Sequence, residues 1–358
     1  MFVVAVDVGY SNLKVIWGQT GQTPATAILP AGAGPASAMP EQLGRARDDR
    51  QVAVMVNGEP WVAGVEPSRL QNWERELHPD YPETLAFRAL CHAAMALAGK
   101  SQIDLLVTGL PVSQYQDKKL QGALRAMLLG SHQVTDKIRV TVKAVEILAQ
   151  PSGAFLDMTE RKDTDEEVEK AAKMLNARTL VIDPGFFSFD WVLVDGGELR
   201  SANSGSSANA MSLLFEVVDD LIQENHGGRL GRDELEKLAR AEVTRVQLFG
   251  SPIELKSYIA VAAKRTATVA LTALKQSLRG ERRPVDVVLL AGGGAKVYED
   301  ATREAFPRAR LEMSDNPVLA NVRGFWAHAN LVAPERESPP APAEASAQQT
   351  EAAYDSAP

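Results

Sequence analysis

The 358-residue sequence contains a single cysteine, Cys91, so no disulfide bond can form within the chain. One buried thiol is typical of a protein in a reducing compartment, and we expect a cytoplasmic location. No run of eighteen apolar residues occurs, and Met1 leads directly into an expected strand without a charged segment before it. We therefore expect neither a membrane-spanning segment nor a secretory signal.

Positive charge is also scarce, because 38 Lys and Arg stand against 46 Asp and Glu, for a net charge of −8. A surface that binds nucleic acid or anionic membrane directly is therefore not expected. Residues 333–358 hold five acidic residues, one basic residue and almost no large apolar side chain. Such a segment buries too little surface to order itself, which predicts a disordered, acidic tail rich in Pro and Ala.

Two common nucleotide-binding signatures are missing. The sequence has no G-x-x-x-x-G-K-[ST], which excludes a P-loop of that type, and no G-x-G-x-x-G, which argues against a Rossmann unit. The length allows about two domains, and the 45% hydrophobic content is sufficient for sizeable cores.

The N-terminal stretch MFVVAVDVGYSNLKV predicts a hairpin, because two β-rich runs flank a short polar turn. Backbone N–H groups of a glycine turn and a lysine ammonium can hold phosphate oxygens, and a carboxylate at a strand end can hold Mg²⁺ through water. An ordinary polar hairpin tip is the alternative. The predicted ligands here are Asp7 for the metal and Gly9, Tyr10, Ser11, Asn12 and Lys14 for the phosphates.

The same plan recurs in TLVIDPGFFSFDWVLV, where Asp183 and Gly185 take the places of Asp7 and Gly9. Two copies of one hairpin predict two related halves that face each other across a cleft. The second copy adds a metal ligand and three nucleotide contacts to the predicted site, namely Asp183, Gly185, Phe186 and Ser188.

Glycine also gathers in VDVVLLAGGGAKVY, where a buried strand at 285–290 is followed by Gly292, Gly293 and Gly294. A bare backbone at this turn lets a nucleotide approach, since a Cβ atom would collide with it. Gly205, in NSGSSANA before an expected helix at 210–223, is a further candidate because amides at a helix start suit an anion. A simple helix cap is the alternative for Gly205.

Between these motifs the patterns predict connecting structure. Residues 19–50 indicate a loop-rich excursion with a charged patch from Arg45 to Arg50, and Asn57-Gly58 indicates a tight hairpin. Residues 84–97 predict a helix that contains Cys91. The charged segment 157–176 predicts a solvated loop and helix. Helical segments are expected to fill 232–280, with apolar residues at helical spacing over 233–240 and 254–278.

In their order along residues 2–332, these motifs resemble those of the actin, hexokinase and heat-shock chaperone ATPase superfamily. TGLPV at 108–112 and the A-N-x-x-G of NPVLANVRGFW resemble ParM/StbA-type and archaeal-type bacterial actins, including the D proteins of PRTRC clusters. The resemblance implies an α/β, actin-like ATPase fold with two related ribonuclease-H-like domains flanking a nucleotide cleft. It implies domain I at 1–150 with an inserted subdomain at about 19–83, domain II at 151–332, and the tail at 333–358.

In that superfamily a polar residue at the start of the helix that crosses between the domains orients the attacking water. Gln150 in AVEILAQPSGAF takes this place by resemblance, and Glu146 is its rival. An amide both donates and accepts a hydrogen bond, so it can hold a water in line with a γ-phosphate. A solvated loop glutamine with no catalytic part is the alternative. The implied catalytic residues are Asp7, Gln150 and Asp183.

Function is a separate step, because this fold carries kinases, chaperones and filaments. A chaperone of the DnaK type needs a peptide-binding domain after the ATPase body, and only the tail remains. The ParM/StbA resemblance implies a cytoplasmic homopolymeric filament that grows with ATP, hydrolyses it with Mg²⁺, and moves plasmid DNA through a DNA-binding adaptor protein. A small-molecule kinase of the sugar or acetate type and a non-hydrolysing actin-like scaffold are the alternatives.

Overall fold

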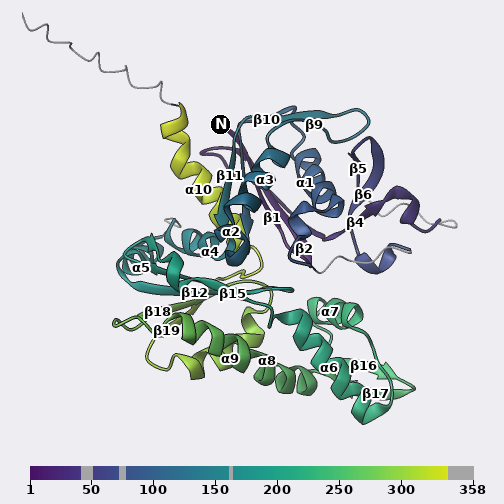
Figure 1. Ribbon diagram of the computed structural model, residues 1–358, viewed down its shortest axis with the longest axis vertical. Coiled ribbons are helices and arrows are strands. Elements are labelled where there is room, and N and C mark those ends of the chain that lie inside the picture. The colour runs from purple at the N-terminus through teal and green to yellow at the C-terminus, as the bar shows by residue number, and fades with distance from the viewer. Residues whose placement is uncertain (42–50, 72–77, 161–163, 338–358) are drawn as a thin grey trace, which may run out of the picture.

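The computed structural model of the protein describes residues 1–41, 51–71, 78–160 and 164–337. The predicted charged patch at 45–50 and residues 338–358 of the predicted tail lie outside these ranges. Figure 1 shows the elements of the N-terminal half in one lobe and most of those of the C-terminal half in a second lobe. Among the described helices, none combines the length and the hydropathy needed to cross a bilayer.

The first lobe is built on a five-stranded sheet of order β11-β8-β1-β2-β3. Its central strand, β1, is buried along its whole length, in keeping with its apolar run Phe2–Val6, and the buried Asp7 follows that run. Helix α1 (Leu85–Ala98) packs on one face of the sheet and α10 (Ala320–Glu337) on the other. The strands are β1 (Phe2–Val8), β2 (Asn12–Gln19), β3 (Ala25–Pro30), β8 (Leu105–Leu110) and β11 (Val145–Ala149).

The second lobe repeats this plan in a six-stranded sheet of order β14-β13-β12-β18-β19, with β15 paired to β13. In both sheets a buried central strand runs antiparallel to its successor and parallel to a later strand. The strands are β12 (Arg178–Pro184), β13 (Phe189–Asp195), β14 (Glu198–Leu199), β15 (Gly205–Ser207), β18 (Val287–Leu290) and β19 (Arg310–Met313).

Helices cover both faces of the second sheet (Figure 1). Side chains of β12 alternate between the two cores, since Leu180 and Ile182 join one hydrophobic cluster and Val181 joins the other. One core is closed by α6 (Met211–His226), α8 (Leu255–Ser277) and α9 (Ala295–Ala305), and the other by α4 (Gln150–Thr159), against which α5 (Asp165–Asn176) packs.

Smaller elements extend the two lobes. Three-stranded sheets of order β4-β6-β5 and β7-β10-β9 belong to the first lobe, and the hairpin of β16 and β17 to the second. Their bounds are β4 (Gly32–Pro35), β5 (Val52–Val56), β6 (Glu59–Val65), β7 (Gln102–Ile103), β9 (Gly130–Gln133), β10 (Arg139–Val142), β16 (Arg245–Leu248) and β17 (Ser251–Glu254); the short helices are α2 (Val112–Gln116), α3 (Lys118–Leu128) and α7 (Arg232–Arg240).

Several local predictions need correction. Strands β3 and β4 lie in the stretch predicted as loop-rich, because pairing with β2 and β6 stabilises segments whose Gly and Ala content hid them. Helices α7 and α8 lie where the sequence shows helical spacing, at 233–240 and 254–278, but helices do not fill 232–280, since the β16–β17 hairpin separates the two. Residues 333–337, the start of the predicted tail, continue α10.

Asp157 also departs from the sequence prediction. The charged segment that it begins was predicted to be solvated, yet its carboxylate is buried in α4. Arg323 of α10 holds it with two hydrogen bonds, of 2.8 Å from Nε and 2.6 Å from Nη2. A charged side chain is buried here because its partner is supplied by a helix far away in the sequence, which local patterning cannot show.

The predicted domain boundary at residue 150 falls where β11 ends and α4 begins. Helix α10 then returns from the second half to pack against both α4 and β1. The two helices cross at Gly153 and Gly324, where a Cβ atom on Gly324 would lie 1.7 Å from the carbonyl oxygen of Gly153. The glycine of the A-N-x-x-G pattern, Gly324, therefore allows the two helix backbones to approach this closely.

Candidate functional site

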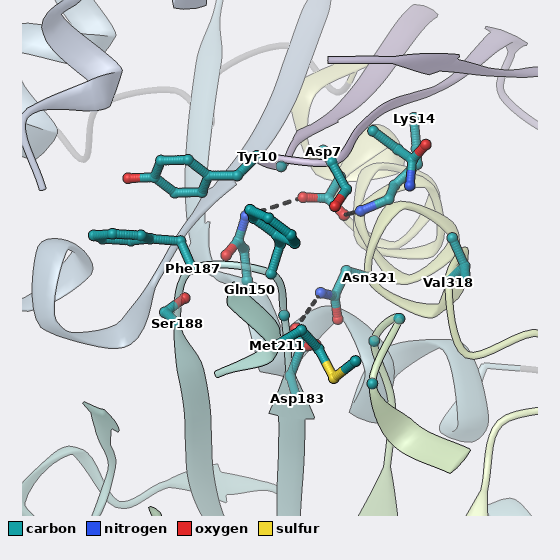
Figure 2. A pocket seen from close by; sticks show the side chains of 18 of the residues that line it. Asp7, Tyr10, Lys14, Gln150, Asp183, Phe187, Ser188, Met211, Val318 and Asn321 are labelled. Atoms are coloured by element: carbon teal, nitrogen blue, oxygen red, sulfur yellow. Dashed lines mark hydrogen bonds and ion pairs between the residues drawn. The ribbon is translucent and has the colours of Figure 1, made fainter. Parts of the chain in front are cut away.

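A cavity of about 720 Å³ lies between the two lobes, at the ends of β1 and β12. The sequence-predicted residues that line it come from four separate segments of the chain. They are Asp7, Gly9, Tyr10, Ser11, Asn12 and Lys14 from the first hairpin, Gln150 from α4, Asp183, Gly185, Phe186 and Ser188 from the second hairpin, and Gly292, Gly293 and Gly294. Figure 2 shows Asp7 and Asp183 approaching from opposite sides, with Gln150 between them.

The two hairpin tips have the same backbone construction. The N–H of Gly9 donates to the carbonyl oxygen of Asn12 over 3.0 Å, and the N–H of Gly185 donates to that of Ser188 over 2.8 Å. At each glycine a Cβ atom would press on the same carbonyl, at 3.2 Å and 3.0 Å. The repeated sequence pattern therefore corresponds to a repeated turn, which presents an aspartate and a hydroxyl to one cavity from each lobe.

Asp7 is 1% exposed and has two partners at the cavity wall. Lys14, opposite it in the β1–β2 register, places Nζ 2.8 Å from Oδ2. Gln150, the first residue of α4, donates from Nε2 to Oδ1 over 3.0 Å, as the dashed line in Figure 2 shows. The predicted catalytic amide and the predicted metal ligand are thus in direct contact.

Asp183 occupies the equivalent position in the second lobe and accepts a hydrogen bond of 2.6 Å from Nδ2 of Asn321, in α10. Burial raises the pKa of its carboxyl group to about 7, and the nearby charges of Asp190 and Asp7 act in the same direction. The hydrogen bond from Asn321 and the charge of Lys14 oppose this shift. Two acidic neighbours and one basic neighbour therefore act on the charge of Asp183.

The residues present fit a magnesium ion that is bound largely through water or phosphate. In the described ranges no three His, Cys, Asp or Glu side chains come together as a metal cluster, so the protein offers only a partial ligand set. Asp7 and Asp183 supply carboxylates of the kind that Mg²⁺ prefers. The Oδ1 atom of Asn321 is buried without a hydrogen-bond partner among the described residues, and it gives a further acceptor for metal-bound water.

Two of the three glycines in the turn after β18 are required by contacts within the protein itself. Gly292 has φ +77°, and a Cβ atom there would lie 1.9 Å from Oδ1 of Asp183. At Gly294 a Cβ atom would lie 2.8 Å from the carbonyl oxygen of Pro184, whereas at Gly293 it would meet nothing within 4 Å. Only Gly293 therefore has the open side that the predicted ligand contact requires, and the other two glycines make room for Asp183 and its strand.

Gly205 does not line the cavity. It lies in β15, where a Cβ atom would come within 2.8 Å of the Trp191 ring. The glycine is needed for packing against an aromatic side chain of the neighbouring strand, which the local Gly and Ser content does not reveal. The structure also separates Glu146 from the cavity, because Glu146 accepts a hydrogen bond from Nε2 of His328 in α10.

The predicted residue Tyr10 belongs to an aromatic group at one edge of the cavity. Its ring stacks on that of Tyr81, which the sequence prediction missed, with centroids 4.5 Å apart, and packs against Phe187 at 4.6 Å. Figure 2 shows the rings of Tyr10 and Phe187 side by side. Asn321 was recognised only as part of the A-N-x-x-G pattern, although a polar residue among small ones was a usable signal. Met211, Glu236, Lys296 and Val318 also line the cavity.

Helix α7 joins the second lobe to the first across the mouth of the cavity. The hydroxyl of Ser11 donates to Oε1 of Glu236, which is 4% exposed. One turn later, Arg240 donates from Nη2 to Glu66 over 2.7 Å. The hydroxyl expected to meet phosphate is therefore paired with a carboxylate of the opposite lobe in this structure.

Comparison with known proteins decides the family. Residues 5–153 match the family described as actin like proteins, N terminal domain, and residues 181–304 match the archaeal actin homologue family, MreB-like, C-terminal. The chain belongs to the actin-like proteins. Its fold is the actin-like ATPase fold, as the sequence resemblance implied. No curated protein sequence matches this actin-like protein.

Solved structures share the fold at low sequence identity. The pCBH ParM non-polymerisable quadruple mutant has a TM-score of 0.70 and 19% identity, covering 92% of this chain and 99% of its own. A 15-stranded ParM filament from Clostridium botulinum has a TM-score of 0.68 and 19% identity, covering 92% and 99%. The archaeal actin homologue Ta0583 in complex with ADP has a TM-score of 0.68 and 18% identity, covering 92% and 100%.

Proposed function

We propose that this actin-like protein binds Mg-ATP in the cavity between its lobes, hydrolyses it, and assembles into homopolymeric filaments. The observation that carries the proposal is the meeting of two equivalent Asp-x-Gly turns and the amide of Gln150 around one cavity. The ADP bound to the archaeal homologue and the filament formed by the ParM protein support the proposal by likeness of fold.

In this proposal the two turns hold the phosphates from opposite sides. Backbone N–H groups beside Gly9 and Gly185, the hydroxyls of Ser11 and Ser188, and the ammonium of Lys14 supply hydrogen bonds and positive charge. The nucleotide would displace Glu236 from Ser11, because a phosphate and a carboxylate compete for the same hydroxyl. The open side of Gly293 leaves room for the adenosine against the glycine turn.

Asp7 and Asp183 would hold the magnesium ion through its waters, and the ion, when bound, supplies positive charge to the β- and γ-phosphates. Burial is the main cause of the raised pKa of Asp183, and the charge of Asp7 adds to it, so a cation held by these carboxylates would favour the ionised form of Asp183. Asn321 keeps the Asp183 carboxylate oriented toward the cavity, since its amide donates to Oδ2.

Gln150 is the proposed positioning group for the attacking water. Its Nε2 is committed to Asp7, which fixes the amide plane, so its carbonyl oxygen is available to accept a hydrogen bond from water. Hydrolysis then depends on positioning and on charge neutralisation, and no side chain with a strongly shifted pKa has to act as the base.

The proposed cellular role is segregation of plasmid DNA in the cytoplasm, with a DNA-binding adaptor protein linking filament and plasmid. The TGLPV and A-N-x-x-G segments support this role through their resemblance to ParM/StbA-type actins. The acidic net charge fits an adaptor between filament and DNA better than direct DNA binding.

Right-angle light scattering and sedimentation of the purified protein test the proposal, with Mg-ATP, Mg-ADP and no nucleotide compared while phosphate release is followed. We expect scattering and pelleting only with Mg-ATP, with decay as phosphate appears. Hydrolysis without assembly would contradict the filament and favour a small-molecule kinase, and assembly without hydrolysis would favour a scaffold.

A further inference from the structure

The turn between β16 and β17 contains an aromatic residue in an unfavourable backbone conformation. Phe249 and Gly250 have φ values of 51° and 78°, so a two-residue turn with two left-handed residues joins the strands. Such turns favour Asn-Gly, and the chain uses Asn57-Gly58, with φ values of 53° and 85°, between β5 and β6. A phenylalanine is disfavoured in the left-handed region, and the hairpin alone does not require one there.

Phe249 is also the most exposed large hydrophobic residue in the described part of the chain, at 79%. Its ring lies beside Gly228, where a Cβ atom would come within 2.5 Å of the ring edge, and the rest of the ring faces solvent. An asparagine would fit the turn and would expose no apolar surface. The phenylalanine therefore indicates a contact that forms only when a partner covers it.

A second cavity, of about 350 Å³, lies at the far end of α8. Its apolar wall includes Leu278, Val285 and Phe306. Lys275 places Nζ 5.7 Å from the centroid of the Phe306 ring, so the cavity combines an aromatic face with a cation above it. A second aromatic ring is well suited to this cavity, because it can pack against the Phe306 ring and make a cation–π interaction with the ammonium group of Lys275.

The hairpin tip and this cavity lie at opposite ends of one helix. Strand β17 leads directly into α8, whose 23 residues span about 35 Å, and Lys275 and Leu278 at its end line the cavity. Figure 1 shows β16 and β17 at one extremity of the second lobe. Phe249 therefore cannot reach the cavity of its own chain, whereas the Phe249 of a second copy can.

The net charge differs between the two ends. Around the cavity, Arg178 pairs with Glu281 and Arg283 pairs with Asp195, so Lys275 and Arg308 leave this end net positive. At the base of the hairpin, the exposed Glu254 pairs with Arg245 and Glu242 pairs with Lys296. Beside Gly228 and the tip, Glu224 is exposed and Arg229 is shared by Asp219 and Asp220, so this end is net negative. This difference in charge favours contact between a tip and a cavity over contact between two tips.

We propose that Phe249 of one copy inserts into the cavity formed by Leu278, Val285 and Phe306 of the next copy. The contact joins two different surfaces, so it repeats head to tail and builds an open filament. This inference rests on the proposed filament function and adds to it a specific contact between subunits.

The test uses Phe249→Asn, which suits the turn and leaves the nucleotide cavity unchanged. We expect this variant to unfold at a higher temperature than wild type, to bind fluorescent ATP normally, and to need at least about tenfold more protein before it pellets with Mg-ATP. Leu129→Asn, which removes an exposed leucine of the first lobe, is the control and should assemble like wild type.

A mixing experiment tests the head-to-tail geometry. Phe249→Asn keeps the cavity, and Ala309→Phe, which fills the cavity, keeps Phe249. Sedimentation velocity should show each variant as a monomer and their mixture as a heterodimer. Unchanged assembly of Phe249→Asn, while wild type assembles, would overturn this inference alone. A wild-type protein that stays monomeric with every nucleotide would instead overturn the proposed filament function as well.

Discussion

Helices α4 and α10 are in backbone contact at Gly153 and Gly324, where a Cβ atom on Gly324 would lie 1.7 Å from the carbonyl oxygen of Gly153. Helix α4 begins with Gln150 at the cavity, and α10 begins with Ala320 and Asn321 beside Asp183. Gln150 and Asn321, which donate to Asp7 and Asp183, are therefore positioned by one close helix crossing. The geometry of the site depends on this crossing as much as on the hairpins themselves.

Gly324→Ala should destabilise the protein by at least about 2 kcal/mol, because the added methyl group has no space between two backbones. Gly122→Ala in α3 is the matched control, since a Cβ atom there would meet nothing within 4 Å. The control should be neutral or stabilising by up to about 1 kcal/mol. Chemical denaturation measures both changes, and equal stability of the two variants would contradict the close crossing.

Asp157→Ala should cost about 3 kcal/mol of unfolding free energy, because it leaves the guanidinium of Arg323 without its carboxylate partner. Glu169→Ala, which removes an exposed ion pair with Lys173, should leave the unfolding free energy almost unchanged. Denaturation of the two variants under the same conditions checks the difference. A loss at Asp157 no larger than that at Glu169 would show that the α4–α10 ion pair is not important for stability.

The raised pKa of Asp183 predicts a pH-dependent term in the stability of the nucleotide-free protein. Between about pH 4 and pH 7 the unfolded chain releases the Asp183 proton, while the folded chain, with a pKa of about 7, retains it. The contribution of Asp183 to the free energy of unfolding therefore falls as pH rises from 4 to 7 and is constant above pH 7.

Asp183→Asn cannot ionise and should remove this term. The unfolding free energy of the variant, taken relative to wild type, should rise across that pH range and then level off. Denaturation at several pH values measures it. A difference that is independent of pH would show that Asp183 titrates normally.

Asp183→Ala should abolish magnesium-dependent phosphate release, because half of the proposed metal site is lost. Asp190→Asn is the comparison, because Asp190 is buried on the neighbouring strand and does not line the cavity. Its carboxylate accepts hydrogen bonds from the hydroxyls of Ser188 and Ser206. This variant should retain measurable activity. Wild-type turnover by Asp183→Ala would remove Asp183 from the proposed mechanism.

Gln150→Ala should slow hydrolysis by about 10²-fold or more and leave ATP affinity within a few fold, since the amide is proposed to act on water. Glu146→Gln should hydrolyse ATP at close to the wild-type rate, because Glu146 pairs with His328 outside the cavity. Single-turnover phosphate release and nucleotide titration separate the two effects. Slow hydrolysis by the Glu146 variant alone would reverse the assignment.

Much of the fold could be predicted because its signals are local. The apolar run of β1, the Asp-x-Gly turns and the Asn57-Gly58 turn each specify their own structure, and the repeat of one hairpin indicates two related halves. The β16–β17 hairpin was missed because its turn uses Phe249, a residue that turns of this type disfavour. That exception is also where we infer a subunit contact.

The site was predictable as a set of motifs, but not in its packing. The order of the motifs, compared with that of the superfamily, predicted that the two hairpins and Gln150 belong to one site. Gly205 and Gly292 are required for a different reason, because a Cβ atom there would collide with Trp191 or Asp183, which are distant in the sequence. The same applies to Asn321, whose bond to Asp183 joins residues 138 positions apart. Contacts of this kind have no periodicity that a single sequence can display.

The most direct test of the account is the rate of phosphate release per protein molecule, measured with Mg-ATP over a range of protein concentrations alongside sedimentation. We predict a low rate at low concentration and a steep rise at the concentration where pelleting begins, because assembly and hydrolysis are coupled. A rate per molecule that stays constant across all concentrations, with no protein in the pellet, would contradict a filament-coupled ATPase.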